Sequence, residues 1–174
     1  NLTVGAAFIA GRPARVIPGS GERIGIDGGQ PLAGSATIRI AYQGRLDDKG
    51  LSGPYRRKVG GEWYAYSTFT PIDARRAFPC FDEPRFKTPF SIAIITPGAN
   101  QAVSNAPLSR KAPMKDGRVR YEFSPTLPLP TLTARTSYMR RSPPITIGSR
   151  EVKLAASFRP RSIAARSALS SSSS

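Results

Sequence analysis

Apolar and polar residues alternate along several short stretches of the chain, as in β-strands that bury one face. The clearest stretch is residues 63–70, where tryptophan, alanine, serine and phenylalanine at odd positions alternate with tyrosine and threonine at even positions. Residues 36–43, 90–95 and 118–124 are further strand candidates, and glycine, proline and aspartate separate the stretches. Many short strands with frequent turns predict a mainly β fold, an antiparallel β-sandwich or a related open sheet.

One short helix is predicted near Pro71–Phe78, directly after the strand at residues 63–70. Thr70 can serve as its N-cap, and Asp73 can reach back to close a capping box. A proline follows at position 79 and biases the residue before it away from the helical conformation. The helix must therefore be short.

The segment DARRAFPCFDEPRFKTPF, residues 73–90, resembles the most recognisable segment of the amino-terminal domain of the M1 family of zinc aminopeptidases. Flanking segments agree with the family in order and spacing, among them GEWYAY at residues 61–66 and VSNAP at residues 103–107. The resemblance covers roughly residues 15–131, and a match of that length is specific. It implies a saddle of β-sheets that packs against a catalytic domain.

The character of the sequence changes after residue 131. We predict that residues 1–131 form the β-sandwich amino-terminal domain, and that residues 132–174 form a basic, Ser-rich tail that is disordered or non-native. In the family a mostly apolar strand follows this point, whereas Arg135, Arg140 and Arg141 stand in its place here. Burying three unpaired guanidinium groups is very costly, so we interpret the change as a loss of the coding frame near this boundary.

The charge distribution supports an alternative function. The formal net charge is +15, and residues 135–174 hold eight Lys or Arg and one Glu, so nearly half of the excess lies there. Together with the aromatic residues of 63–70 and the basic stretch Arg56–Lys58, this tail suggests a small basic β-domain that binds nucleic acid or another polyanion. The strict aromatic alternation is more typical of a sandwich core with one solvated face.

The chemistry implied by the resemblance is removal of amino-terminal residues from peptides. That reaction needs zinc held by a HExxH pair and a third acid, but the chain contains no histidine. We therefore expect no catalytic residue, metal ligand or cofactor in this chain, which should be inactive on its own. Zinc would belong to the catalytic domain of a parent enzyme, which is missing here and is the expected partner.

The first function predicted is thus a substrate-gating and structural domain of a zinc-dependent M1 aminopeptidase, which meets peptide substrates together with the catalytic domain. The chain begins with asparagine rather than methionine, so we expect a processed form or a fragment. No stretch approaches the roughly 20 apolar residues of a membrane span.

The resemblance also implies a substrate contact. One loop of the family's amino-terminal domain reaches the mouth of the active site, and many members carry Gln-x-Glu there to hold the free amino group of the substrate. Thr68, Phe69 and Thr70 align with that motif and are the candidate substrate-binding residues by position. A threonine hydroxyl cannot match the charge-assisted bond of a carboxylate to an ammonium group.

Two further features of the motif have structural interpretations. Asp82 and Glu83 can meet a cation, but pairing with nearby arginines is favoured. The candidate partners are Arg75, Arg76 and Arg85. Cys80 is the only cysteine and lies between proline and phenylalanine, so we predict a buried small hydrophobe rather than a reactive thiol.

Overall fold

The structure is a computed structural model of the chain, and it describes residues 2–134, 136–140 and 146–156. Regular structure in these residues consists of β-strands and two short 3-10 helices, so the predicted mainly β fold is confirmed. The chain divides into two compact units. Among the described residues, the larger unit consists of those within 2–5 and 41–150, and the smaller of 6–40 and 151–156.

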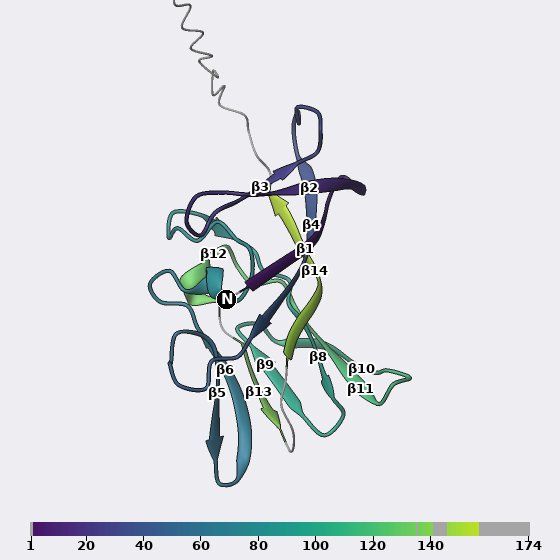
Figure 1. The fold of residues 1–174 in the computed structure, drawn as a ribbon. Helices are drawn as coiled ribbons and strands as arrows, with labels where there is room; N and C mark the ends of the chain where they lie inside the picture. Colours follow the sequence, from purple (N-terminus) through teal and green to yellow (C-terminus); the bar gives the residue numbers. More distant parts are fainter. Residues whose placement is uncertain (1, 135, 141–145, 157–174) are drawn as a thin grey trace, which may run out of the picture. The chain divides into compact units, whose positions relative to one another are not determined.

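A four-stranded antiparallel sheet of the larger unit carries the candidate site. Its order is β5-β6-β13-β9. The strands are β5 (Gly53–Val59), β6 (Glu62–Thr68), β13 (Thr136–Arg140) and β9 (Gln101–Ser104). Figure 1 shows β5 and β6 as a long hairpin. Strand β6 coincides with the clearest alternating stretch, and its Ala65 and Ser67 are buried, as the period-2 pattern requires.

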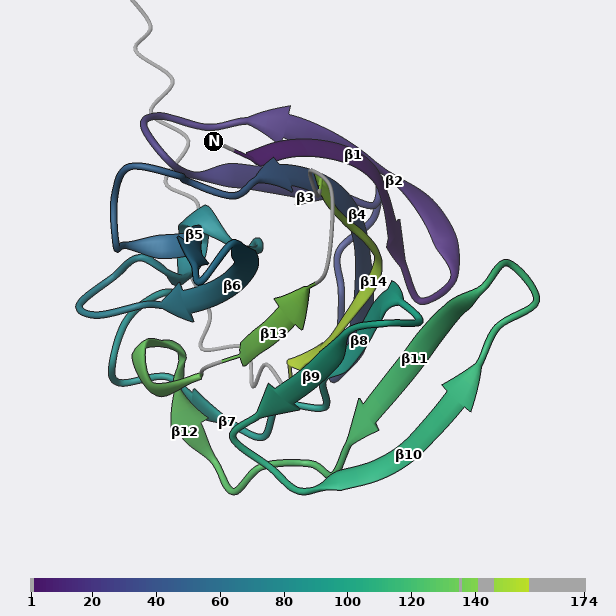
Figure 2. The same cartoon turned by 90° about the horizontal axis from the view of Figure 1, so that it is seen from below.

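A three-stranded antiparallel sheet of order β10-β11-β8 also belongs to the larger unit, and Figure 2 shows β10 and β11 as a second hairpin. The strands are β8 (Ala93–Pro97), β10 (Leu108–Pro113) and β11 (Arg118–Phe123). Tyr121 and Phe123 of β11 are buried and form a core cluster with Ala102. A two-stranded sheet pairs β7 (Lys87–Thr88) with β12 (Leu129–Pro130).

The remaining sheet has the order β14-β4-β1-β2-β3. Its strands are β1 (Leu2–Ile9), β2 (Arg12–Pro18), β3 (Ile24–Asp27), β4 (Ala36–Arg45) and β14 (Thr146–Ala156). Within the smaller unit, β2 pairs with β1 and β3 in antiparallel register, and an ion pair of 3.0 Å joins Arg15 to Asp27 across β2 and β3.

The predicted helix near Pro71–Phe78 is a single 3-10 turn, η1 (Ala74–Arg76), and the N-cap assigned to Thr70 is wrong. Asp73 occupies the N-cap position and makes no side-chain cap bond. Its N–H donates to the carbonyl of Phe69 at 3.0 Å, which closes a turn before the helix begins. Thr70 lies inside that turn, where a side chain cannot cap η1.

Residues 73–90 form a corner, the motif corner, and a second apolar cluster is its core. Phe69, Ala74 and Ala134 are almost fully buried in it. Partly buried apolar residues pack around them, namely Ala77, Phe78, Cys80, Phe90 and Leu129. A second 3-10 turn, η2 (Thr131–Thr133), follows β12 and precedes Ala134. The corner therefore joins the end of β6 to the segment after β12.

Described residues also occur within the predicted tail, residues 132–174. Strand β13 pairs with β6 through Ser137↔Tyr66 and with β9 through Ser137↔Val103, and β14 belongs to the five-stranded sheet. That the tail is disordered or non-native stays a prediction. Its Ser-rich end, residues 157–174, lies outside the described residues, as do Arg135 and Arg141.

Candidate functional site

The three candidate substrate-binding residues lie where β6 ends. Thr68 is the last residue of β6, is half-buried, and stands opposite Gly53 of β5. Phe69 is 4% exposed, whereas Thr70 is exposed. The structure thus divides their roles, because a buried phenyl ring anchors the segment and the two hydroxyl-bearing residues flank it.

Aromatic packing fixes this anchor. The rings of Phe69 and Phe78 meet edge to face with centroids 5.8 Å apart, and Phe78 meets Phe90 in the same way at 6.4 Å. Ala74 of η1 is fully buried against them. Edge-to-face pairs of this kind stabilise a core beyond their buried area. The end of β6 is consequently held by the helical turn and by the loop before β8.

Asp82 ties the motif corner together. Its Oδ2 accepts hydrogen bonds from the backbone N–H of Arg75 at 3.1 Å and from Nε of the same residue at 3.0 Å. Its Oδ1 accepts a hydrogen bond of 2.6 Å from the hydroxyl of Thr131. Glu83 pairs with Arg85 at 2.8 Å on the surface. The predicted arginine pairing of both acids is confirmed, so this corner is a structural joint.

Cys80 packs beside the core cluster and is half-buried. Burial raises the pKa of its thiol to about 12, and the neighbouring Asp82 carboxylate adds to the rise. A thiol with so high a pKa stays protonated at neutral pH and is a poor nucleophile and metal ligand. Cys80 is thus an apolar packing residue rather than a reactive thiol, as predicted, although it is half-buried rather than fully buried.

A second set of contacts beside Thr68 escaped the sequence analysis. Arg76 of η1 lies 3.6 Å from Asp47 and 3.7 Å from Asp73, measured between nitrogen and carboxylate oxygen. Gly53 has φ +69°, and a Cβ on it would lie 2.9 Å from the Cβ of Arg76. The only signal in the sequence is a glycine directly before Pro54 at the start of a strand.

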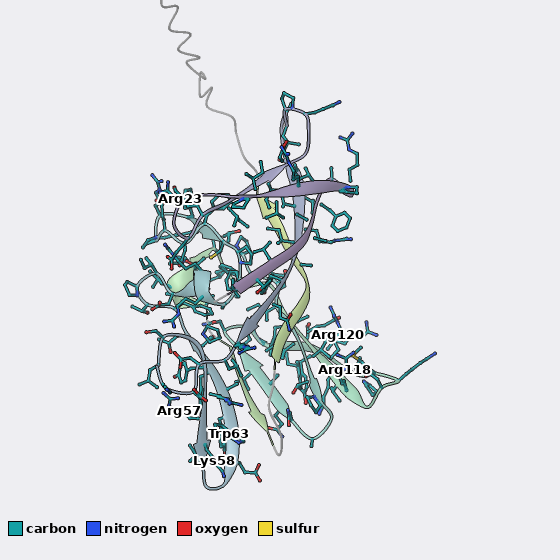
Figure 3. The ribbon with its side chains drawn as sticks, viewed as in Figure 1. Arg23, Arg57, Lys58, Trp63, Arg118 and Arg120 are labelled. Atoms are coloured by element: carbon teal, nitrogen blue, oxygen red, sulfur yellow. The ribbon has the colours of Figure 1, made fainter. Side chains whose placement is uncertain are left out.

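The arginines of the basic stretch Arg56–Lys58, which lies in β5, make contacts within the chain. Arg57 donates from Nη1 to the carbonyls of Asp48 and Arg56 at 2.7 and 2.8 Å. Its Nη2 donates to the carbonyls of Lys49 and Gly50 at 2.7 and 2.6 Å. Figure 3 labels Arg57 on the hairpin together with Lys58 and Trp63. The Arg57 guanidinium thus braces the loop between β4 and β5.

The aromatic residues of the hairpin stack on one another. Tyr66 stacks with Tyr55 at 5.5 Å and with Tyr64 at 6.3 Å between ring centroids. The Arg56 guanidinium lies 4.7 Å from the ring centroid of Trp63. A platform for nucleic acid needs ring faces open to bases, but here neighbouring side chains cover ring faces. The polyanion alternative is therefore not favoured.

The residues that the structure describes do not fit a zinc ion. Among the described residues, no group of three or more His, Cys, Asp or Glu could hold a metal. Near the motif the ligand types are also engaged, because Asp82 accepts three hydrogen bonds and the Cys80 thiol is protonated. In the part of the chain that is described, no helix is long and apolar enough to cross a membrane.

Comparison with known families decides the assignment. Residues 20–132, more than half of the chain, match the family described as the Peptidase M1 N-terminal domain. The chain belongs to this family. The M1 resemblance of the motif segment is therefore confirmed, and the four-stranded sheet, the motif corner and the Thr68–Thr70 segment all contain residues of the matched region.

Several curated M1 aminopeptidases are similar to this amino-terminal domain. Aminopeptidase M1-A of Oryza sativa subsp. japonica is 44% identical over 79 residues, which are 43% of this chain and 9% of that protein. Endoplasmic reticulum aminopeptidase 1 of Homo sapiens is 38% identical over 99 residues, 55% of this chain and 10% of that protein. The chain thus spans about a tenth of the length of these relatives.

Solved structures share the fold of this amino-terminal domain. An M1 zinc metallopeptidase from Deinococcus radiodurans superposes with a TM-score of 0.65 at 20% identity, over 87% of this chain and 36% of that chain. A mutant M1 zinc metallopeptidase from the same organism, bound to a Tyr-Ser-Ala substrate, gives a TM-score of 0.67 at 21% identity. That second comparison covers the same two fractions.

Proposed function

We propose that this chain acts as the amino-terminal domain of a zinc-dependent M1 aminopeptidase, with a structural and substrate-gating role. Its partner is the catalytic domain of that enzyme, and the substrates are peptides that lose their amino-terminal residue. The family match over residues 20–132 carries the proposal, and the names of the relatives support it. Zinc, held by the catalytic domain, would polarise the scissile carbonyl and activate water.

In this proposal Thr68 and Thr70 line the entrance to the active site. Phe69 is locked in the core, so the segment between β6 and η1 has a fixed starting point. Thr70 is exposed and carries a neutral hydroxyl where many family members carry a carboxylate. A hydroxyl donates or accepts one ordinary hydrogen bond, which is weaker than the bond of a carboxylate to an ammonium group. The segment therefore shapes the entrance and contributes little charge.

A chimeric enzyme tests the proposal. Residues 20–132 replace the matching segment of the rice Aminopeptidase M1-A, and hydrolysis of alanine p-nitroanilide is followed. Thr70→Glu restores the carboxylate, so we expect KM to fall about tenfold while kcat stays within about twofold. Ser91→Glu, at an exposed position, is the matched control for the added charge and should leave KM unchanged. Equal kinetics of the Thr70→Glu variant and the parent chimera would refute the gating role.

A further inference from the structure

Arg76 connects two segments that flank the candidate site. Its Nη2 lies 3.6 Å from Oδ2 of Asp47 in the loop between β4 and β5. Its Nη1 lies 3.7 Å from Oδ1 of Asp73, the residue before η1. Both carboxylates are partly buried, with side chains 31% and 21% exposed. One guanidinium therefore spans from the β4–β5 loop to the turn that contains Thr70.

The Asp47 end of this connection is fixed. Oδ1 of Asp47 accepts hydrogen bonds from the N–H groups of Lys49 and Gly50 at 2.8 and 2.9 Å. These bonds hold the pKa of the carboxyl group below its usual range, so it is charged at neutral pH. The backbone of Asp47 also bonds to β5, through the carbonyl of Pro54 at 3.0 Å and the N–H of Arg56 at 2.8 Å. Asp47 is thus fixed to β5, the edge strand of the four-stranded sheet.

The absence of a side chain at Gly53 leaves room for Arg76 beside the four-stranded sheet. A side chain at Gly53 would put a Cβ 2.9 Å from the Cβ of Arg76, closer than two such atoms approach. Gly53 pairs with Thr68 across β5 and β6, so Arg76 lies beside the residue directly opposite Thr68. The base of the Arg76 side chain therefore lies close to the backbone of Gly53, and the absence of a side chain at Gly53 permits this approach.

The Asp73 end is tied to the turn itself. The N–H of Asp73 donates to the carbonyl of Phe69 at 3.0 Å, so Thr70 lies between a core anchor and a residue that Arg76 holds. Phe69 fixes only the first end of the turn. The second end rests on η1, a single helical turn that buried Ala74 and the bonds from Arg75 to Asp82 hold to the core. Arg76 adds the connection from this turn to the β4–β5 loop.

We infer that Arg76 is a positioning residue, which sets the place of Thr68 and Thr70 by clamping the turn to the β4–β5 loop. The inference rests on the proposed function, since it assigns a role to Arg76 in presenting the same segment to a peptide. The side chain of Arg76 is 45% exposed and lies outside the core cluster. Its replacement should therefore loosen the turn without unfolding the larger unit.

Hydrogen exchange of the full chain tests the clamp directly. In Arg76→Gln, the amide of Asp73 should exchange about fivefold faster, the change expected when two partly exposed ion pairs are lost. Arg76→Lys keeps the charge and should restore most of the protection. Arg85→Gln removes an exposed arginine pair elsewhere in the motif and should leave the Asp73 amide unchanged. Unchanged exchange in Arg76→Gln would overturn the inference.

The kinetics of the chimera separate positioning from a purely structural role. We expect Arg76→Gln to raise KM about threefold to tenfold with kcat within about twofold, and Arg76→Lys to reverse the change. If Thr70→Glu lowers KM but Arg76→Gln leaves it unchanged, the inference alone fails. If neither substitution alters KM while the Asp73 amide still exchanges faster, the proposed function fails, and the positioning role fails with it.

Discussion

Loss of the Asp82 carboxylate should destabilise the larger unit more than any surface charge does. Asp82 is 6% exposed and accepts three hydrogen bonds, two from Arg75 and one from Thr131. Asp82→Asn keeps the shape of the side chain and removes its charge. The amide can still accept a hydrogen bond from Thr131, but it turns an N–H₂ group towards two N–H donors of Arg75.

The expected cost follows from burial. Removing one partner of a buried ion pair costs about 3–5 kcal/mol. The Arg75 side chain is 32% exposed and regains some hydration, so the cost should lie at or below the lower end of this range. We expect Asp82→Asn to lower the free energy of unfolding by about 2–3 kcal/mol. For a chain of this size the melting temperature should fall by roughly 6–9 °C.

Urea unfolding followed by tryptophan fluorescence measures this loss. Trp63 is the only tryptophan and lies in β6, within the same unit as Asp82. The matched control is Glu83→Gln, because the Glu83–Arg85 pair is exposed, at 56% and 73%. The control should lose less than about 0.5 kcal/mol. If Asp82→Asn loses no more than the control, the corner is not a buried joint and the reasoning is refuted.

Three further predictions concern backbone strain, thiol reactivity and pH. Gly53→Ala should cost at least about 1–2 kcal/mol from its left-handed φ, plus the 2.9 Å clash with Arg76. Gly60→Ala, at φ +58° with no atom within 4 Å of the added Cβ, carries the backbone strain alone. Equal urea midpoints of the two variants would contradict the clash at Gly53. Because its pKa is raised to about 12, Cys80 should react with a disulfide reagent at pH 8 at least about 100-fold slower than in the urea-unfolded chain, and equal rates would contradict burial. The backbone N–H groups of its own loop lower the pKa of Asp47, so its stabilisation is full above about pH 4 and is lost as pH falls through the folded-state pKa. The wild type and Asp47→Asn should therefore differ in stability at pH 7 and converge at acid pH; a constant difference would contradict this.

Local patterns predicted the parts of this fold that local physics determines. The alternation over residues 63–70 predicted β6 and its buried Ala65 and Ser67, because a strand sends successive side chains to opposite faces. The acids of the motif were assigned to nearby arginines, and Asp82 and Glu83 do form those pairs.

The parts that failed depend on contacts between distant segments. The capping signals at Thr70 are genuine local preferences, but the bond from Asp73 to Phe69 closes a turn there and moves the helix start. The connection from Arg76 to Asp47 was missed because it joins η1 to a loop before β5. The sequence likewise does not show that Gly53 has a positive φ or that Arg76 lies beside it. Sequence alone does not show which distant segment will meet a glycine.

The distribution of charge around the site shapes the proposed mechanism. Every acid near the Thr68–Thr70 segment that the structure describes has a structural partner, Asp47 and Asp73 on Arg76 and Asp82 on Arg75. Two neutral hydroxyls cannot balance the ammonium group of a peptide. Under the proposed function, the negative charge that holds that group must therefore come from the catalytic domain. The amino-terminal domain would then control access by the position of its turn, which makes the rigidity of that turn its main contribution.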